Sequence, residues 1–317
     1  MSGLGGVVAP GYEPVLAAFR ENFAKRDETG ASVVVYVGGE KVVDLHGGVR
    51  DRTARAPWDD QTLQILFSAT KGLVATCFLV LRDRVGFDLD APVASVWSGF
   101  GAAGKEGITI AQILDHTAGL VAIDRPLSLD DLEGWSTDRS PGRVLDALES
   151  QAPVWEPGTS QGYHAISYGL FAGELFKRLA GETVGSFLRR EVAGPLGADV
   201  WLGLPASQER RVATLYPNGP AAFFRSILPA VVAGSSVEGR IYRRFLDPRS
   251  LTRRAFANPA ALGVRGVRNF DTARVRAMEL PWASGVGSAD GLARVYAALA
   301  SGGLVSPGVV ASVAARR

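Results

Sequence analysis

The sequence has a single cysteine, Cys77, and only three histidines among its 317 residues. One cysteine cannot form an internal disulfide, and it excludes a zinc site built on several thiolates. The histidines are His46, His116 and His164, and none has the paired spacing near carboxylates that metal ligands show. The sequence therefore predicts no metal centre.

Long apolar runs are also absent. The longest, residues 72–81, has ten residues, about half the length that a membrane-spanning helix needs. The first fourteen residues contain no basic start, no apolar core of signal-peptide length and no A-x-A cleavage site. From these absences we expect a soluble chain that does not span a membrane and is located in the cytoplasm.

Neither sign of charge is in excess, since 34 Lys and Arg residues face 32 Asp and Glu residues. The net charge of +2 does not indicate a nucleic-acid partner. Residues 240–276 are the exception, with ten arginines, two aspartates and a local net charge of +8. Because this segment lacks a known binding motif, we interpret it as a solvated helical cap rather than as a nucleic-acid or anionic-membrane surface. Beside an active site, such a cap would steer carboxylate-bearing substrates.

The chain does have the composition of a folded protein, with 47% hydrophobic and 21% charged residues. Its length suits one large domain or two smaller ones. Apolar spacing and helix-start residues predict many helices but only one β-hairpin, which turns at Gly38 and Gly39. Two strands do not form a stable sheet alone, so further strands either lie in weakly patterned segments or are missing. The expected strands cover residues 31–37 and 41–45, and the expected helices cover residues 14–26, 68–84, 163–179 and 288–299, with shorter ones after Thr109, Pro141, Thr183 and Ser306.

One catalytic pattern can be set aside. Residues 158–162 (GTSQG) match the G-x-S-x-G pattern around the nucleophile of α/β-hydrolases, and residues 46–48 (HGG) resemble the start of an oxyanion loop. That fold requires a strand directly before the serine and a histidine well downstream of it. The last histidine, His164, follows Ser160 by only four residues, and residues 155–158 have a turn sequence. We therefore interpret the match as a coincidence.

A second pattern, S-x-x-K, occupies residues 68–71 (SATK) at the start of the strongly apolar helical segment. If Ser68 opens this helix, Lys71 lies one turn later on the same face, within reach of the hydroxyl. The helix N-terminus would provide N–H groups for an oxyanion, and burial would favour a neutral lysine that can act as a base. On these four residues alone, the favoured interpretation is an ordinary N-cap serine beside a snorkelling lysine.

Three segments, in order along the chain, carry a family resemblance. The first surrounds Ser68 (residues 62–75, TLQILFSATKGLVA). The second, residues 108–120 (ITIAQILDHTAGL), is similar to an "IT-x-x-x-LL-x-HT-x-GL" segment. The third, residues 155–170 (WEPGTSQGYHAISYGL), is similar to "W-x-PGT…Y-x-N…GY-x-LLG", which holds a second catalytic motif. From about residue 12 to the end, the chain resembles the class C β-lactamase-like serine hydrolases, which include family VIII carboxylesterases and penicillin-binding-protein-like members.

The resemblance implies an α/β (α+β) fold, in which an antiparallel sheet flanked by helices joins a mostly helical domain. Residues 1–90 and 275–317 would form the sheet-containing part, and residues 91–274 the helical part with a cap insertion. It also implies hydrolysis of small carboxylic esters through an acyl-enzyme, without a cofactor, and it leaves the oligomeric state open.

The resemblance assigns catalytic roles to three residues. Ser68 would be the acylated nucleophile, Lys71 its proton partner and Tyr163 the general base, in preference to the rival Tyr168. A phenol is a weak base, and a nearby cationic lysine would favour its phenolate form. The histidines have structural roles in this interpretation: His116 would satisfy loop backbone groups, His164 would pack beside Tyr163 and could line the acyl pocket, and His46 would lie on the second hairpin strand.

The chain departs from the family pattern at two points. Ala165 stands where the lactamases have an asparagine that holds the β-lactam amide, which favours ester substrates over antibiotics. No convincing third motif (K-T-G, H-x-G or W-x-G) is found, and residues 285–287 (GVG) look flexible and precede a helix. We therefore expect a member shortened at its C-terminus, with an incomplete sheet and weak or no activity, since one lost oxyanion donor typically costs about 10²–10³ in rate. The alternative is a non-catalytic β-lactamase-like protein.

Overall fold

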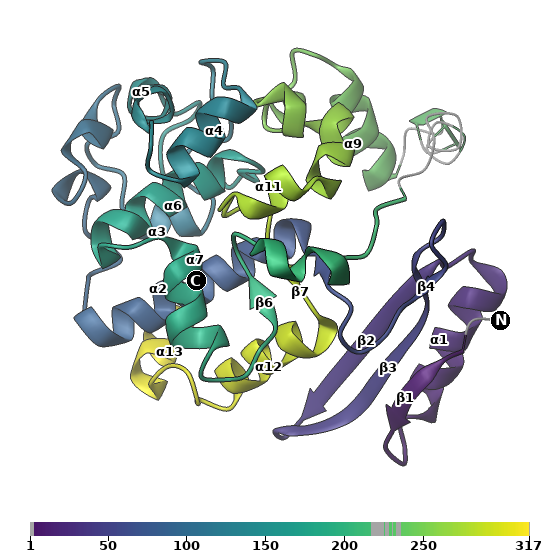
Figure 1. The fold of residues 1–317 in the computed structure, drawn as a ribbon. Helices are drawn as coiled ribbons and strands as arrows, with labels where there is room; N and C mark the ends of the chain where they lie inside the picture. Colours follow the sequence, from purple (N-terminus) through teal and green to yellow (C-terminus); the bar gives the residue numbers. More distant parts are fainter. Residues whose placement is uncertain (1–2, 217–224, 226–227, 230, 233–235, 317) are drawn as a thin grey trace. The chain divides into compact units, whose positions relative to one another are not determined.

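The computed structural model describes residues 3–216, 225, 228–229, 231–232 and 236–316. Part of the predicted helical region 91–274 therefore lies outside the described residues. The chain divides into two compact units. The first comprises Met1–Gly86, Glu182–Thr214 and Ser284–Arg317, and the second comprises Phe87–Gly181 and Leu215–Ala283. Figure 1 traces both units by sequence colour.

The larger sheet lies in the first unit and has the strand order β1-β3-β2, with antiparallel neighbours. The predicted hairpin between β2 and β3 is confirmed. Its turn residues Gly38 and Gly39 have φ angles of 58° and 88°, which glycine adopts without strain. The short strand β4 pairs with β3 near its end. The bounds are β1 (Gly5–Val8), β2 (Gly30–Val37), β3 (Glu40–Asp51) and β4 (Ala56–Pro57).

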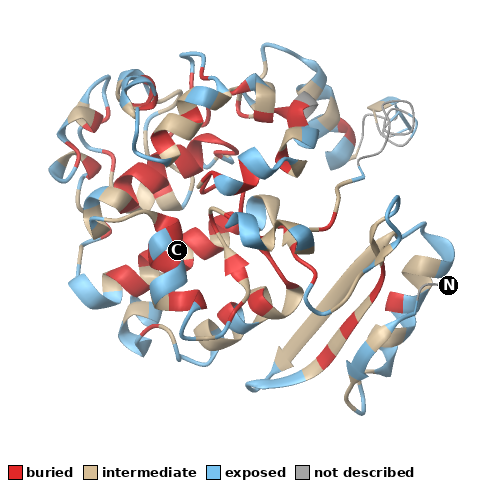
Figure 2. Cartoon of the chain, in the orientation of Figure 1, coloured by how far each residue is buried: buried red, intermediate tan, exposed pale blue. Residues whose placement is uncertain are grey.

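Helix α1 (Glu13–Lys25) packs on one face of this sheet (Figure 1). Successive strand residues point to opposite faces, so Val43 and Leu45 of β3 face the helix together. Both are buried against Phe19 of α1. The opposite face carries polar residues, and Figure 2 shows the resulting alternation of buried and part-buried positions along β3.

A second, three-stranded sheet in the first unit consists of β5 (Gln64–Ile65), β7 (Val286–Gly287) and β6 (Val200–Trp201), in that order. The expectation that residues 285–287 are flexible is wrong. Val286 is fully buried, and β7 pairs with a strand on each side. A strand of two residues is too short to show an alternating pattern, which is why the sequence did not reveal it.

The predicted apolar helix is confirmed as α2 (Thr70–Val85), which is preceded by a 3₁₀ turn at Phe67–Ala69. Buried residues run along most of its length, and it ends at Gly86, whose φ is 71°. The other helical segments of the first unit are α7 (Val184–Phe187), a π-helical turn (Leu188–Ala193), a 3₁₀ segment (Ala206–Arg211), α12 (Ala289–Ala300) and α13 (Pro307–Ala314).

The second unit is built from helices. Its core contains Trp97, Phe100 and Phe171, whose rings are in mutual contact. Thr109 and Ser128 begin α3 and α4 with capping boxes, so two of the exposed N–H groups of these helices are satisfied by side chains. The helices are α3 (Ile110–Leu114), α4 (Leu129–Ser136), α5 (Gly142–Ser150), α6 (Ser167–Ala180), α9 (Val237–Leu246), α10 (Leu251–Arg254) and α11 (Ala273–Ala277), with 3₁₀ segments at Val93–Ser95, Ser98–Gly101, Ala260–Leu262 and Val264–Asp271.

Helix α6 begins at Ser167, four residues later than the sequence predicted. The preceding residues 163–166 are held in a loop by side-chain hydrogen bonds. The backbone N–H of His164 donates to Nδ1 of His116 at 3.2 Å, and the His164 ring bonds to the Gly162 carbonyl at 2.6 Å. These hydrogen bonds hold residues 163–166 in a non-helical conformation, although the sequence of these residues also fits a helix.

Candidate active site

The S-x-x-K residues lie together at the start of α2. Ser68 occupies the 3₁₀ turn, and Lys71 lies in the first turn of the helix. The Lys71 amine donates a hydrogen bond to the Ser68 hydroxyl, with Nζ and Oγ 3.4 Å apart. Lys71 is only 8% exposed, and this burial lowers the pKa of its amine to about 7. In a large fraction of the molecules the Lys71 amine is therefore neutral at neutral pH.

The backbone before Ser68 is unusual. Phe67 has a φ of 45°, in the left-handed region that bulky residues rarely enter. Such positions cost about 1–3 kcal/mol and persist where the surrounding structure enforces them. Here the neighbouring Leu66 donates its N–H to the carbonyl of Gly285, at 2.7 Å. The residue before the serine is thus held in a strained conformation by the segment that leads into β7.

A second bond ties the same segment to α2. The Gly285 N–H donates to Oγ1 of Thr70 at 3.0 Å, and Thr70 is fully buried. A Cβ atom at position 285 would lie 2.5 Å from that oxygen, so only glycine fits. Gly285 therefore holds both sides of the turn that carries Ser68. Sequence reasoning missed this role because Gly285 and Thr70 are distant along the chain.

Tyr163 lies in the second unit, in the loop before α6. Its side chain is 46% exposed, and its ring lies 5.2 Å from the ring of His116. The rival Tyr168 is only 3% exposed and packs on His116 from within α6, with 5.0 Å between ring centroids. Of these two tyrosines, Tyr163 is therefore the one accessible to solvent.

Two histidines organise the loop around Tyr163. Nε2 of His164 accepts the Leu120 N–H at 2.9 Å, so its Nδ1 carries the hydrogen and donates to the Gly162 carbonyl. Burial lowers the pKa of His164 to about 4, which keeps this ring neutral. His116 accepts the His164 N–H, which confirms that it satisfies a loop backbone group. His46 lies on β3 as predicted.

The rejected G-x-S-x-G pattern lies in an exposed turn. Ser160 is exposed, and in the described chain no strand directly precedes it. The arrangement of an α/β-hydrolase nucleophile is therefore not present at residues 158–162.

The arginine-rich segment 240–276 includes α10 and most of α9 and α11, so much of it is helical. Several of its arginines bind carboxylates of the same unit rather than projecting freely. This pairing reduces the positive charge that the segment presents. The pairs are Arg254 with Asp124, Arg274 with Asp130 and Glu133, and Arg276 with Asp271.

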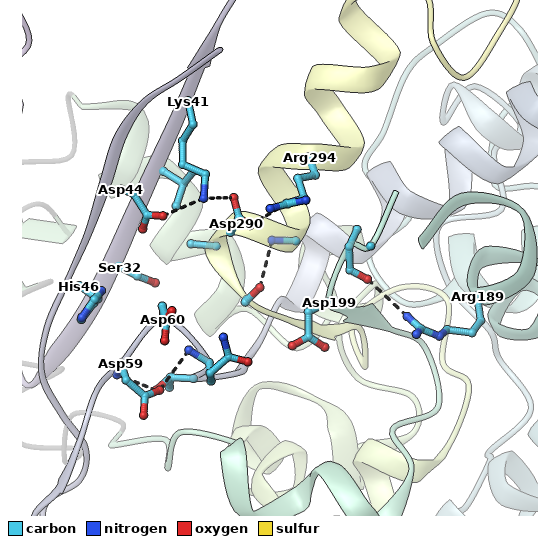
Figure 3. A pocket seen from close by; sticks show the side chains of 18 residues that line it. Ser32, Lys41, Asp44, His46, Asp59, Asp60, Arg189, Asp199, Asp290 and Arg294 are labelled. Atoms are coloured by element: carbon cyan, nitrogen blue, oxygen red, sulfur yellow. Dashed lines mark hydrogen bonds and ion pairs between the residues drawn. The ribbon is translucent and has the colours of Figure 1, made fainter. Parts of the chain in front are cut away.

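A polar cavity of about 470 Å³ lies in the first unit, between the polar face of the larger sheet and the start of α12. Figure 3 shows Lys41 between Asp44 and Asp290, with 2.8 Å from its amine to each carboxylate. Neither Ser68 nor Lys71 lines this cavity. Four of its charged groups form one ion-pair cluster, in which Asp290 binds both Lys41 and Arg294 and Lys41 also binds Asp44.

The described residues contain no group of three or more His, Cys, Asp or Glu side chains that could hold a metal ion. No helix among them is long and apolar enough to cross a membrane.

The comparisons with known proteins agree on one family. The family model described as "Beta-lactamase" matches residues 16–317. The esterase/β-lactamase LipL of Mycobacterium tuberculosis is 32% identical over 303 residues, which cover 94% of this chain and 65% of LipL. This chain thus spans less than two thirds of the length of that relative.

Two solved structures share the fold. The crystal structure of a family VIII carboxylesterase superposes with a TM-score of 0.80 at 35% identity, covering 98% of this chain and 76% of the other. A penicillin-binding protein homologue from Caulobacter crescentus gives a TM-score of 0.78 at 32% identity, covering 97% of this chain and 76% of the other. The expected fold class, with antiparallel sheets flanked by helices and a mostly helical part, is thereby confirmed. The chain belongs to the β-lactamase family of serine hydrolases.

Proposed function

We propose that this protein is a serine hydrolase that cleaves small carboxylic esters through an acyl-enzyme on Ser68. The observation that carries the proposal is the Lys71 amine, buried, hydrogen-bonded to the Ser68 hydroxyl and with a pKa of about 7. A serine becomes a nucleophile when an adjacent base can take its proton, and a neutral amine can do so. The esterase names of the relatives support the same reaction class.

In the acylation step, the Ser68 oxygen attacks the ester carbonyl carbon while its proton moves to the Lys71 amine. The negative charge that develops on the carbonyl oxygen is favoured by N–H groups at the start of α2. When the intermediate collapses, the bond to the alcohol oxygen breaks and the acyl group remains on Ser68. We assign to Tyr163 the transfer of a proton to the departing alcohol, in relay with Lys71.

In the deacylation step, water attacks the acyl carbon and Tyr163, as general base, takes its proton. As it does so, Tyr163 passes its own phenol proton to Lys71. The bond to Ser68 then breaks, protonated Lys71 returns this proton to the serine oxygen, and the carboxylic acid leaves. The exposure of Tyr163, in contrast to the buried Tyr168, supports this assignment because a proton-transferring phenol must reach the substrate.

The substrate class is ester rather than β-lactam in this proposal. Ala165 follows the Tyr163-His164 pair at the position where lactamases carry an asparagine, and it is a buried apolar side chain with no amide to offer. A site with no such partner gives no specific binding to the lactam amide.

A fluorophosphonate probe tests the nucleophile directly, because it forms a stable covalent bond only with an activated serine. We expect intact-mass analysis to show one adduct on the full-length chain and none on Ser68→Ala. Ser160→Ala serves as the matched control, since it removes the exposed serine of the G-x-S-x-G turn, and we expect it to label like the wild type. If the wild type stays unlabelled, the non-catalytic alternative is correct.

A further inference from the structure

A row of aromatic rings extends from Tyr163 into the cap of the second unit. The rings of Tyr163 and Phe256 are 6.4 Å apart, and those of Phe256 and Phe245 are 5.1 Å apart. Phe245 belongs to α9, and Phe256 follows α10. Both phenylalanines are partly exposed, so this row is not a closed core. The exposed parts of these two rings therefore provide apolar surface beside the Tyr163 phenol.

The segment that carries Phe256 is fixed to a loop of the same unit. Arg254 binds the Asp124 carboxylate at 2.6 Å. The Asn258 side chain donates to the carbonyls of Ile123 and Arg125, at 2.8 and 2.7 Å, and accepts the Leu127 N–H at 2.9 Å. One amide group thus satisfies three backbone groups of the loop 123–127. Because bonds on both sides of Phe256 hold the backbone, its ring is presented in a defined place.

A further bond positions the second ring. The Arg253 guanidinium donates to the carbonyl of Phe245, at 3.1 Å. This bond links the end of α10 to α9, and the two helices contact each other, so the segments that carry the two rings are held together. A rigid aromatic surface binds a flat partner at low entropic cost, because the protein side has little freedom to lose.

We infer that Phe256, backed by Phe245, binds the alcohol portion of the ester and selects esters of aromatic or other flat apolar alcohols. The inference rests on the proposed function, in which Tyr163 gives a proton to the departing alcohol. The alcohol oxygen must then lie beside the Tyr163 phenol, and the carbon skeleton attached to it extends along the neighbouring rings. Aromatic stacking and apolar burial favour a ring there over a methyl group.

Benzyl acetate and methyl acetate test this inference. They share the acyl group, and their alcohols are similarly acidic, so they differ mainly in the ring. For the wild type we expect a higher kcat/KM with benzyl acetate. For Phe256→Ala we expect the ratio of the two kcat/KM values to fall about tenfold, with a smaller fall for Phe245→Ala and recovery in Phe256→Tyr.

Phe23→Ala is the matched control, because Phe23 is a part-buried phenylalanine that contacts another, Phe19, in the first unit. We expect it to leave the ratio unchanged. If Phe256→Ala lowers both rates equally and keeps the ratio, Phe256 only supports the cap and the inference is wrong.

Saturation-transfer NMR with benzyl alcohol gives a readout that does not need turnover. A wild type that is inactive on both esters contradicts the proposed function. Even then, loss of the saturation-transfer signal of the benzyl alcohol ring in Phe256→Ala supports the inferred alcohol-binding surface. An unchanged signal in that variant contradicts the inference.

Discussion

Two buried lysines show how the same side chain acquires different roles. Lys105 is fully buried, and its amine donates to three backbone carbonyls, those of Ala102, Glu149 and Gln151, each at 2.7 Å. All its N–H groups serve as structural donors, although burial lowers its pKa to about 8. Lys71 is similarly buried but faces a hydroxyl. A lysine that faces a group able to give up a proton can act as a base, so chemistry depends on the partner rather than on burial alone.

The pH dependence of the reaction follows from the lowered pKa of Lys71. Only the neutral amine can accept the Ser68 proton, and below pH 7 its fraction falls about tenfold per pH unit. We therefore expect kcat/KM for p-nitrophenyl acetate to decline on the acidic side, with a midpoint near pH 7. A pH–rate profile of the full chain measures this decline.

Variants show whether the decline belongs to Lys71. In Lys71→Arg the cation persists at all these pH values, so we expect activity to fall by about 10²–10⁴. His46→Gln removes an imidazole from β3 and should keep the midpoint. A profile that loses its acidic decline in His46→Gln would contradict the assignment.

Elements with long local patterns could be predicted from the sequence, and very short ones could not. The β2–β3 hairpin has two valine-rich runs and a Gly-Gly turn, and α2 has an unbroken apolar pattern, so both were predicted correctly. Strand β7 has two residues, and its position depends on pairing with β5 and β6 from distant parts of the chain. Similarly, the bonds of His164 end the helical pattern at Ser167, and no local signal shows them.

The link between β7 and α2 is testable at Gly285. A methyl group there would lie 2.5 Å from Oγ1 of the fully buried Thr70, which cannot move away freely. We expect Gly285→Ala to lower the free energy of unfolding by about 1–3 kcal/mol, as overpacked positions do, and to slow fluorophosphonate labelling of Ser68. Urea denaturation and timed intact-mass analysis measure the two effects. Gly142→Ala, where a methyl group meets nothing within 4 Å, should change neither.

At the scale of the whole molecule, the three candidate catalytic residues come from separate parts of the chain: Ser68 and Lys71 belong to the first unit, and Tyr163 belongs to the second. The Ser68–Lys71 pair could be predicted because one helical turn brings the two residues together, and the structure places their side chains 3.4 Å apart. Tyr163 follows 92 residues after Lys71, and only its motif indicated it. The ring contact of Tyr163 with Phe256 joins segments that are about as far apart in the sequence, and no sequence pattern indicated it. The contact within one helical turn was therefore predictable from the sequence, and the contact between distant segments was not.

Cooperation between Lys71 and Tyr163 can be measured with a double-mutant cycle. In the proposed relay a proton must pass both groups, so removing either one stops the same step. We expect Lys71→Met and Tyr163→Phe each to lower kcat/KM by about 10²–10⁴, and the double variant to lose little more than the more damaging single change. Tyr168→Phe is the matched control, since it removes the hydroxyl of the buried rival, and we expect it to retain activity. If the two losses in kcat/KM multiply in the double variant, the two residues act in separate steps. If only Tyr168→Phe loses activity, the catalytic role belongs to Tyr168 instead of Tyr163.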